Sequence, residues 1–208
     1  TLFRSQSSVE VVLETGQKVQ YNASSQVAVS RPYMRSVRAG PVADLLFLYD
    51  GKQFVLFDRG RNLYALSAAP GGLDQALTDA RDRLDLQAPG ADLLYSDVAQ
   101  GLMEDFTSLQ YLGIEAVDGA KTHHLAARKP GVDWQLWIED GGTPLPRKYV
   151  ITTTNLPQSP QFEVSLRNWD LSPKFEKGSF SFQPPQGASR IEFLEQPKAP
   201  GTATGGSK

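Results

Sequence analysis

A predicted hairpin between residues 45 and 57 restricts the possible folds of this chain more than any other segment. Two apolar runs flank Asp50-Gly51, a residue pair typical of the type I′ turn in a two-residue hairpin loop. This turn pairs Phe47 with Phe54 and leaves large apolar side chains on both faces of the two strands. Such a strand pair must be covered on both sides. The sequence therefore predicts a sheet with packing elements against both faces of this hairpin.

Strands dominate the rest of the sequence, because apolar and polar residues alternate with a period of two. The first predicted hairpin turns at Thr15-Gly16-Gln17, with Gly16 in the left-handed conformation and Val11 opposite Tyr21. The expected strands lie near residues 9–13, 19–30, 34–38, 45–49, 53–57, 62–67, 109–115, 121–128, 132–138, 148–154 and 162–170. The expected count is thus about eleven, and residues 175–193 are ambiguous, with room for one more strand.

Residues 72–106 interrupt this alternation and predict two amphipathic helices, which Pro89-Gly90 separates. The apolar positions are Leu73, Leu77, Ala80 and Leu84 in the first helix and Leu94, Val98, Leu102 and Phe106 in the second. Ser96 or Asp97 is the expected N-cap of the second helix. Since the remaining positions are mostly polar, both helices are expected to pack their apolar faces on the sheet.

The composition excludes several classes of function. The 208 residues contain no cysteine, which rules out disulfides, zinc–thiolate sites, iron–sulfur clusters and thiol catalysis. Lys and Arg number 21 against 23 Asp and Glu, so no basic nucleic-acid-binding surface is expected. The longest apolar run covers only residues 45–49, whereas a membrane-spanning helix needs about 20 residues. The length predicts one domain at residues 1–194, followed by a flexible Pro- and Gly-rich tail at 195–208.

No standard catalytic motif is present. The sequence lacks a nucleophile elbow, a phosphate loop, a dinucleotide fingerprint and a zinc-protease helix. Two carboxylate pairs, Glu104-Asp105 and Glu139-Asp140, could serve acid–base chemistry, but both lie beside turns or helix ends where acidic residues commonly serve solubility. We therefore expect no enzyme activity, no metal site and no cofactor.

The only two histidines are neighbours, so their side chains point to opposite faces of a strand and cannot bind one metal ion together. A two-residue turn at 130–131 places His123 inward beside Trp134 and His124 outward beside Asp133. His123 is expected to be a core imidazole or, alternatively, a polar group that orients a ligand in an apolar cavity. His124 is expected to belong to a solvated polar patch.

The apolar side chains that share one face of the sheet, with those of the helices, are the most informative set. Two interpretations remain open: an ordinary core, or the wall of an apolar cavity between a broad sheet and two short helices. The candidate ligand-binding residues are Phe54, Leu56, Leu77, Leu102, Met103, His123, Trp134, Leu136, Tyr149, Ile151, Phe162 and Val164.

Several short motifs carry a family resemblance. They are Tyr49-Asp50-Gly51-Lys52, Arg61-Asn62-Leu63-Tyr64-Ala65, Pro130-Gly131-Val132-Asp133-Trp134-Gln135 and Leu145-Pro146-Arg147-Lys148-Tyr149-Val150. From about residue 3 to 193 the chain resembles an uncharacterised family of predicted periplasmic proteins in the LolA/LppX-like superfamily of lipoprotein carriers. The resemblance implies an α+β fold, an antiparallel, unclosed half-barrel with two helices inserted as a lid over an apolar cavity. It also implies a periplasmic location, with a signal peptide that this chain does not include.

Two functions compete on this basis. The resemblance implies a periplasmic, non-enzymatic binding or carrier protein for a lipid, a lipoprotein acyl chain or a similar apolar ligand. The alternative is a protein-interaction or envelope-sensing module that uses the same half-barrel and its unpaired strand edges without a ligand. A hydrolase using His123 or His124 with an acidic partner is a third, weaker hypothesis. The expected partners are an apolar or acylated ligand and a membrane-associated protein, but no nucleic acid.

Overall fold

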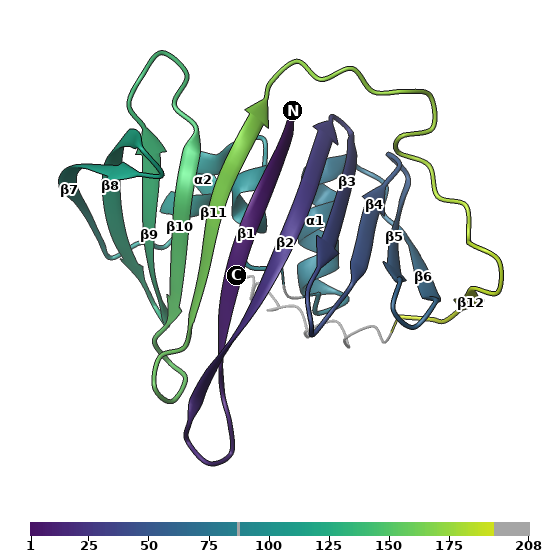
Figure 1. Ribbon diagram of the computed structural model, residues 1–208, viewed down its shortest axis with the longest axis horizontal. Coiled ribbons are helices and arrows are strands. Elements are labelled where there is room, and N and C mark those ends of the chain that lie inside the picture. The colour runs from purple at the N-terminus through teal and green to yellow at the C-terminus, as the bar shows by residue number, and fades with distance from the viewer. Residues whose placement is uncertain (87, 194–208) are drawn as a thin grey trace, which may run out of the picture.

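The computed structural model describes residues 1–86 and 88–193, and its strands form one twelve-stranded sheet (Figure 1). The strands are β1 (Leu2–Val12), β2 (Lys18–Ser30), β3 (Tyr33–Ala39), β4 (Leu45–Tyr49), β5 (Gln53–Asp58), β6 (Leu63–Ala68), β7 (Ser108–Val117), β8 (Ala120–Lys129), β9 (Val132–Glu139), β10 (Pro146–Thr153), β11 (Gln161–Asp170) and β12 (Ser189–Arg190). Their spatial order is β12-β6-β5-β4-β3-β2-β1-β11-β10-β9-β8-β7. The tail predicted at 195–208 lies outside the described residues.

The order of the strands explains where the helices lie. Strands β1–β6 and β7–β11 form two meanders, which β1 and β11 join in the middle of the sheet. The chain must therefore cross the sheet between β6 and β7, and it does so on one face (Figure 1). The crossing contains α1 (Leu73–Asp82), the 3₁₀ helix η1 (Ala91–Leu94) and α2 (Val98–Met103). We call this helix-covered face the concave face and the opposite one the outer face.

The sheet is not closed, since β7 and β12 form its two edges in the described part of the chain. The predicted α+β, antiparallel half-barrel with inserted helices is therefore confirmed. The strand count rises to twelve because β12, within the ambiguous region 175–193, pairs in parallel with β6. Neither helix has the length and apolar character to cross a bilayer, as far as the described residues go.

The apolar hairpin β4–β5 is covered on both sides, as predicted. On the concave face, Tyr49 and Phe54 belong to the core cluster that also includes the buried face of α1. On the outer face, Phe182 contacts Phe57 and Tyr64, with ring centroids 5.6 and 5.4 Å apart. The segment after β11 therefore acts as a strap over one end of the outer face.

Both hairpin registers predicted in the first half of the chain are wrong by two residues. Tyr49, not Phe47, lies opposite Phe54, because Asp50 precedes the turn and its side chain accepts hydrogen bonds from the next amides, including that of Gln53. In the first hairpin, Val11 lies opposite Val19 rather than Tyr21, since the loop occupies residues 14–16. Gly16 adopts the expected left-handed conformation, with φ of 81°. A shift of two residues keeps every side chain on its predicted face.

The second predicted helix is shorter than expected. Asp97 is its N-cap, as proposed, and accepts a hydrogen bond from the backbone N–H of Gln100 at 2.8 Å. Leu94, however, belongs to η1, and Phe106 lies beyond the end of α2 and is exposed. The lid therefore consists of one helix of ten residues and two short helical turns.

Candidate functional site

The candidate residues on β9, β10 and β11 come together in rows across the concave face. Leu136 lies opposite Tyr149, and Tyr149 lies opposite Val164, so the three side chains form a continuous buried row. The next row places Trp134 opposite Ile151 and Ile151 opposite Phe162. Period-two alternation alone puts these residues on one face, and the strand pairing brings the rows into contact.

The helices complete the enclosure from the other side. Leu77 on α1 and Leu102 on α2 are buried in the same cluster as Phe54 and Trp134. Ile151 and Phe162 are half-buried at its borders, whereas Leu56 on β5 is half-buried outside this cluster. The prediction that Met103 faces inward is wrong: 45% of its surface is exposed, at the C-terminal end of α2.

Trp134 carries a polar group that the protein leaves without a partner. The residue is only 4% exposed, and its indole nitrogen Nε1 has no hydrogen-bond acceptor among the described residues. A buried N–H without an acceptor costs free energy comparable to the desolvation of that group, about 1–3 kcal/mol. An atom of this kind inside an apolar enclosure is a specific docking point for a ligand oxygen.

Tyr149, next to Trp134, has its polar group satisfied. Burial raises the pKa of its phenol, and the neighbouring carboxylate of Asp92 raises the pKa further. The phenol therefore stays neutral and interacts with Asp92 at the start of η1. Gly90, with φ of 86°, takes the left-handed conformation directly before η1. A side chain at this position would face Phe162, Val164 and Tyr149, so the start of η1 lies over β10 and β11.

The two histidines follow the predicted register but not the predicted burial. His124 lies opposite Trp137 on the outer face, and His123 lies on the concave face, as expected. The side chain of His124 is nevertheless the more buried, 14% exposed against 40% for His123. The ring of Trp137 stacks on His124 at 4.0 Å, and Glu115 contacts its Nδ1 at 2.7 Å. His123 lies past the end of the lid, so the concave face is open there.

His123 is not a core imidazole: its ring is partly exposed and lies within hydrogen-bond distance of two side chains. Its Nδ1 is 3.0 Å from the hydroxyl of Tyr111, and its Nε2 is 3.1 Å from Asp140, which also contacts Lys121 at 2.6 Å. The hydrogen bond from Lys121, with that from His123, lowers the pKa of Asp140. This exposed cluster surrounds no described cavity. Among residues 1–86 and 88–193, no group of three acidic or histidine side chains could hold a metal ion.

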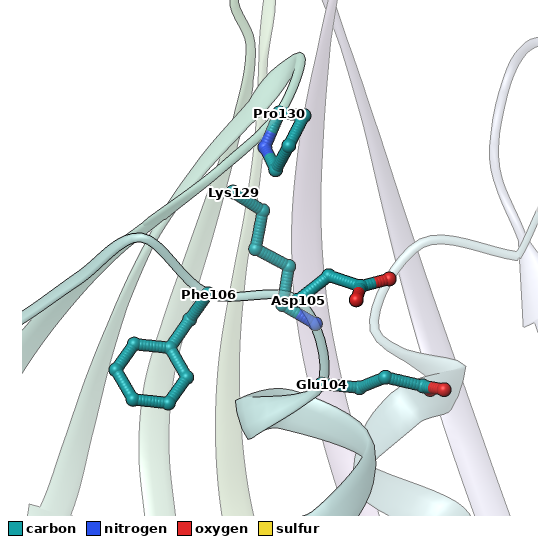
Figure 2. A pocket seen from close by; sticks show the side chains of 5 residues that line it. All are labelled: Glu104, Asp105, Phe106, Lys129 and Pro130. Atoms are coloured by element: carbon teal, nitrogen blue, oxygen red, sulfur yellow. The ribbon is translucent and has the colours of Figure 1, made fainter.

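A hollow of about 450 Å³ lies beside the end of α2 (Figure 2). It is lined by Glu104, Asp105, Phe106, Lys129 and Pro130. Lys129 donates a hydrogen bond from Nζ to the carbonyl of Gly101 on α2, at 3.0 Å. Lys129 also lies two residues beyond Ala127, the cross-strand partner of Trp134. The hollow is therefore at the end of the concave face nearest to Trp134, although none of the twelve candidate residues lines it.

The sequence-based prediction missed a polar stripe on the concave face. The strand pairing places Ser5 opposite Ser25 and Ser25 opposite Arg38, in the row next to buried Phe3 and Val27. The alternation did contain a signal, since Ser5 and Ser7 occupy inward positions of β1 where apolar residues are expected. The stripe places hydroxyls and one cation inside the half-barrel.

Comparisons with known proteins agree with this architecture. The family model described as "Predicted periplasmic protein (DUF2092)" matches residues 2–194. An uncharacterized conserved protein from Thermus thermophilus is 10% identical over 92% of this chain and 90% of its own, with a TM-score of 0.50, so the fold is shared. The lipoprotein LppX of Mycobacterium tuberculosis is 15% identical over 85% and 90% of the two chains, with a TM-score of 0.48. A LolA superfamily protein from Nitrosomonas europaea is 11% identical over 87% and 90%, with a TM-score of 0.36. No curated protein matches the sequence significantly.

Proposed function

Because this chain belongs to the DUF2092 family of predicted periplasmic proteins, we propose that it acts in the periplasm as a non-enzymatic carrier or binding protein for an acylated, largely apolar ligand. The ligand lies between the concave face of the sheet and the lid formed by α1, η1 and α2. Lipids and the acyl chains of lipoproteins are ligands of this kind.

The unpaired indole N–H of Trp134 is the observation that carries this proposal. Apolar surroundings provide the burial energy for an acyl chain, about 0.8 kcal/mol per buried CH₂ group. One N–H donor aimed at an ester or amide oxygen then supplies orientation, the usual arrangement in small-molecule sites. The hollow beside α2 is the proposed entrance, because it opens next to this part of the face.

A binding assay with matched ligands tests this function. The protein is stripped of bound lipid under denaturing conditions, refolded, and mixed with methyl palmitate or hexadecane for native mass spectrometry. We expect one methyl palmitate per chain, and several-fold weaker binding to the Trp134→Phe variant, which keeps an aromatic ring but lacks the donor. Hexadecane should bind both proteins equally. If neither compound binds the wild-type protein, the carrier function is wrong.

A protein-interaction module is the second candidate, and the edge strand β7 favours it. Leu109, Tyr111, Leu112 and Ile114 are all more than 40% exposed on this strand, whose outer backbone edge has no strand partner in the described part of the chain. Unpaired edges with apolar side chains recruit added strands. If this function is correct, a Leu112→Lys, Ile114→Lys double variant should lose complexes that the Trp134→Phe variant retains, as measured by crosslinking in periplasmic extract.

A further inference from the structure

Arg38 is a cation on the concave face that no described residue neutralises. Its strand partners are Ser25 on β2 and Leu45 on β4. It follows buried Met34 by four residues on β3, so both side chains lie on the concave face. The guanidinium Nε is buried and has no acceptor, and no described carboxylate lies within ion-pair distance of Arg38. The neighbours on this face are all uncharged: Ala23, Ser25, Val27, Ser36, Leu45 and Phe47. Arg38 therefore remains positively charged without an anionic partner.

The nearest acidic residue in the same row is already engaged. Asp58 lies one strand beyond Leu45 and accepts hydrogen bonds from both the backbone and the side chain of Arg61. By contrast, Ser5 and Ser25 continue the row of Arg38 toward Leu166 with hydroxyl groups. A guanidinium beside hydroxyls and without a carboxylate favours a phosphate or carboxylate ligand, which accepts several charge-assisted hydrogen bonds.

Three side-chain N–H donors on the concave side are buried without an acceptor. Four buried side-chain atoms in the described residues have no hydrogen-bond partner: Ser8 Oγ, Arg38 Nε, Trp134 Nε1 and Trp169 Nε1. The last three are N–H donors of residues on the concave side, where Trp169 stacks on Phe3 at 4.4 Å and packs against the core. Since buried polar groups are normally satisfied, each of these donors is a position at which a ligand with acceptor atoms can bind.

We infer that the ligand is an anionic amphiphile, whose phosphate or carboxylate head group binds Arg38 beside Ser5 and Ser25 while its chain extends toward Trp134. This inference rests on the proposed carrier function and adds the chemical class of the ligand. Five strand spacings of about 4.8 Å separate β3 from β9, or about 24 Å across the sheet, and the rows of Arg38 and Trp134 are also four residues apart along β11, at Leu166 and Phe162. An acyl chain of about 15 Å, half of a bilayer's hydrocarbon core, therefore covers part of this path from the Arg38 end.

The test compares two probes that differ only in the head group, dodecyl phosphate and dodecanol, with inorganic phosphate as a third. Their affinities are measured by isothermal titration for the wild-type protein and for Arg38→Gln, Arg38→Lys and Arg35→Gln. Arg35 is the matched control: it is on the same strand, faces outward, and lines a separate hollow of about 440 Å³ with Lys174. We expect the wild type to prefer dodecyl phosphate about tenfold or more, and Arg38→Gln to lose this preference while binding dodecanol unchanged.

The other variants and probes show which part of the inference is wrong if a result differs from the expected one. Arg38→Lys keeps the charge but loses the forked hydrogen bonding, so its preference should lie between those of the wild type and Arg38→Gln. If Arg38→Gln fails to fold, an undiminished preference in Arg38→Lys overturns the inference. A preference that survives in Arg38→Gln, or disappears in Arg35→Gln, places the anion elsewhere and overturns the inference. Inorganic phosphate that binds as tightly as dodecyl phosphate indicates a site for a free anion and also overturns it. Equal binding of both amphiphiles refutes only the head-group site, whereas no binding of either refutes the carrier function itself.

Discussion

At the scale of single residues, two substitutions of Trp134 distinguish the contribution of its ring packing to stability from that of its N–H group. Its ring fills space between the sheet and the lid, while its N–H is buried without an acceptor. Trp134→Ala should lower the free energy of unfolding by about 3–5 kcal/mol if the ring is packed core, as for other deleted core aromatics, and by less if the ring lines a ligand cavity. Trp134→Phe should cost less than Trp134→Ala, because the phenyl ring keeps part of the packing and the lost donor made no bond in the ligand-free protein. Urea denaturation measures both values.

Two results decide how Trp134 is used. A loss in Trp134→Phe as large as that in Trp134→Ala would contradict the absence of a bond to the N–H in the free protein. The full loss in Trp134→Ala would count against ligand space at this position, whereas a loss well below about 3 kcal/mol would mean that the ring lines an open cavity, since a removed ring with few neighbours forfeits little.

At the scale of elements, a small polar network holds the lid. Asp74 on α1 accepts hydrogen bonds from Arg31 at 2.6 Å and from the backbone N–H of Ser96 at 3.1 Å. Arg31 also donates to the carbonyl of Leu94 in η1. One carboxylate therefore ties together α1, the turn between β2 and β3, and the chain before α2. The network is exposed, so water can compete with each of its bonds.

This network makes the lid sensitive to acid. Burial tends to raise the pKa of Asp74, but the hydrogen bonds from Ser96 and Arg31 outweigh it and hold the pKa below the ordinary value of 3.8. A carboxyl with a lowered pKa stabilises the folded state above its ordinary pKa and loses that contribution as the pH falls through the lowered value. We expect amide exchange in residues 73–103, measured by mass spectrometry and corrected for intrinsic rates, to accelerate relative to the strands below about pH 4.

Substitution of the same carboxyl should reproduce the effect at neutral pH. Asp74→Asn is expected to accelerate exchange in α1 and α2 without changing the strands, because it removes the charge that Arg31 pairs with. Asp82→Asn is the matched control, since Asp82 pairs with exposed Arg81 at the far end of the same helix. Equal acceleration in both variants would indicate a general loss of helix charge, not a specific contact.

At the scale of the whole molecule, the two faces of the sheet are covered by different parts of the chain. The lid covers the concave face from the middle of the sequence, whereas residues after β11 cross to the β6 edge and cover part of the outer face (Figure 1). Each cover is a long-range contact, because β5 lies far from Phe182 in the sequence. The stability of β4–β6 therefore depends on segments packed against both faces of the sheet.

Removing one aromatic residue of the strap tests this dependence. Phe182→Ala should lower the free energy of unfolding by about 1–3 kcal/mol, less than a full core aromatic because the ring is half-buried. Leu171→Ala, at an exposed position of the same segment, should change it by less than about 0.5 kcal/mol. Thermal unfolding followed by circular dichroism compares the two. Equal effects would mean that the strap contributes little packing on the outer face.

The alternation of side chains determined the strands, the turn at 130–131 and the face on which each residue lies. It did so even where the register was wrong by two residues, because a pleated strand repeats its orientation every second residue. The sequence also predicted the N-cap of α2 as Ser96 or Asp97, since a cap is a local hydrogen bond, and the structure has Asp97.

Only the tertiary structure decided how much of each face is covered. His123 and Met103 lie on or near the concave face, yet they are exposed because the lid ends before it reaches β7. For Arg38 the sequence pattern predicted only a position in a strand. The lack of an acceptor for its Nε depends on the residues of β2 and β4 beside it. Orientation follows from the local backbone, whereas burial and pairing follow from contacts between segments far apart in the sequence.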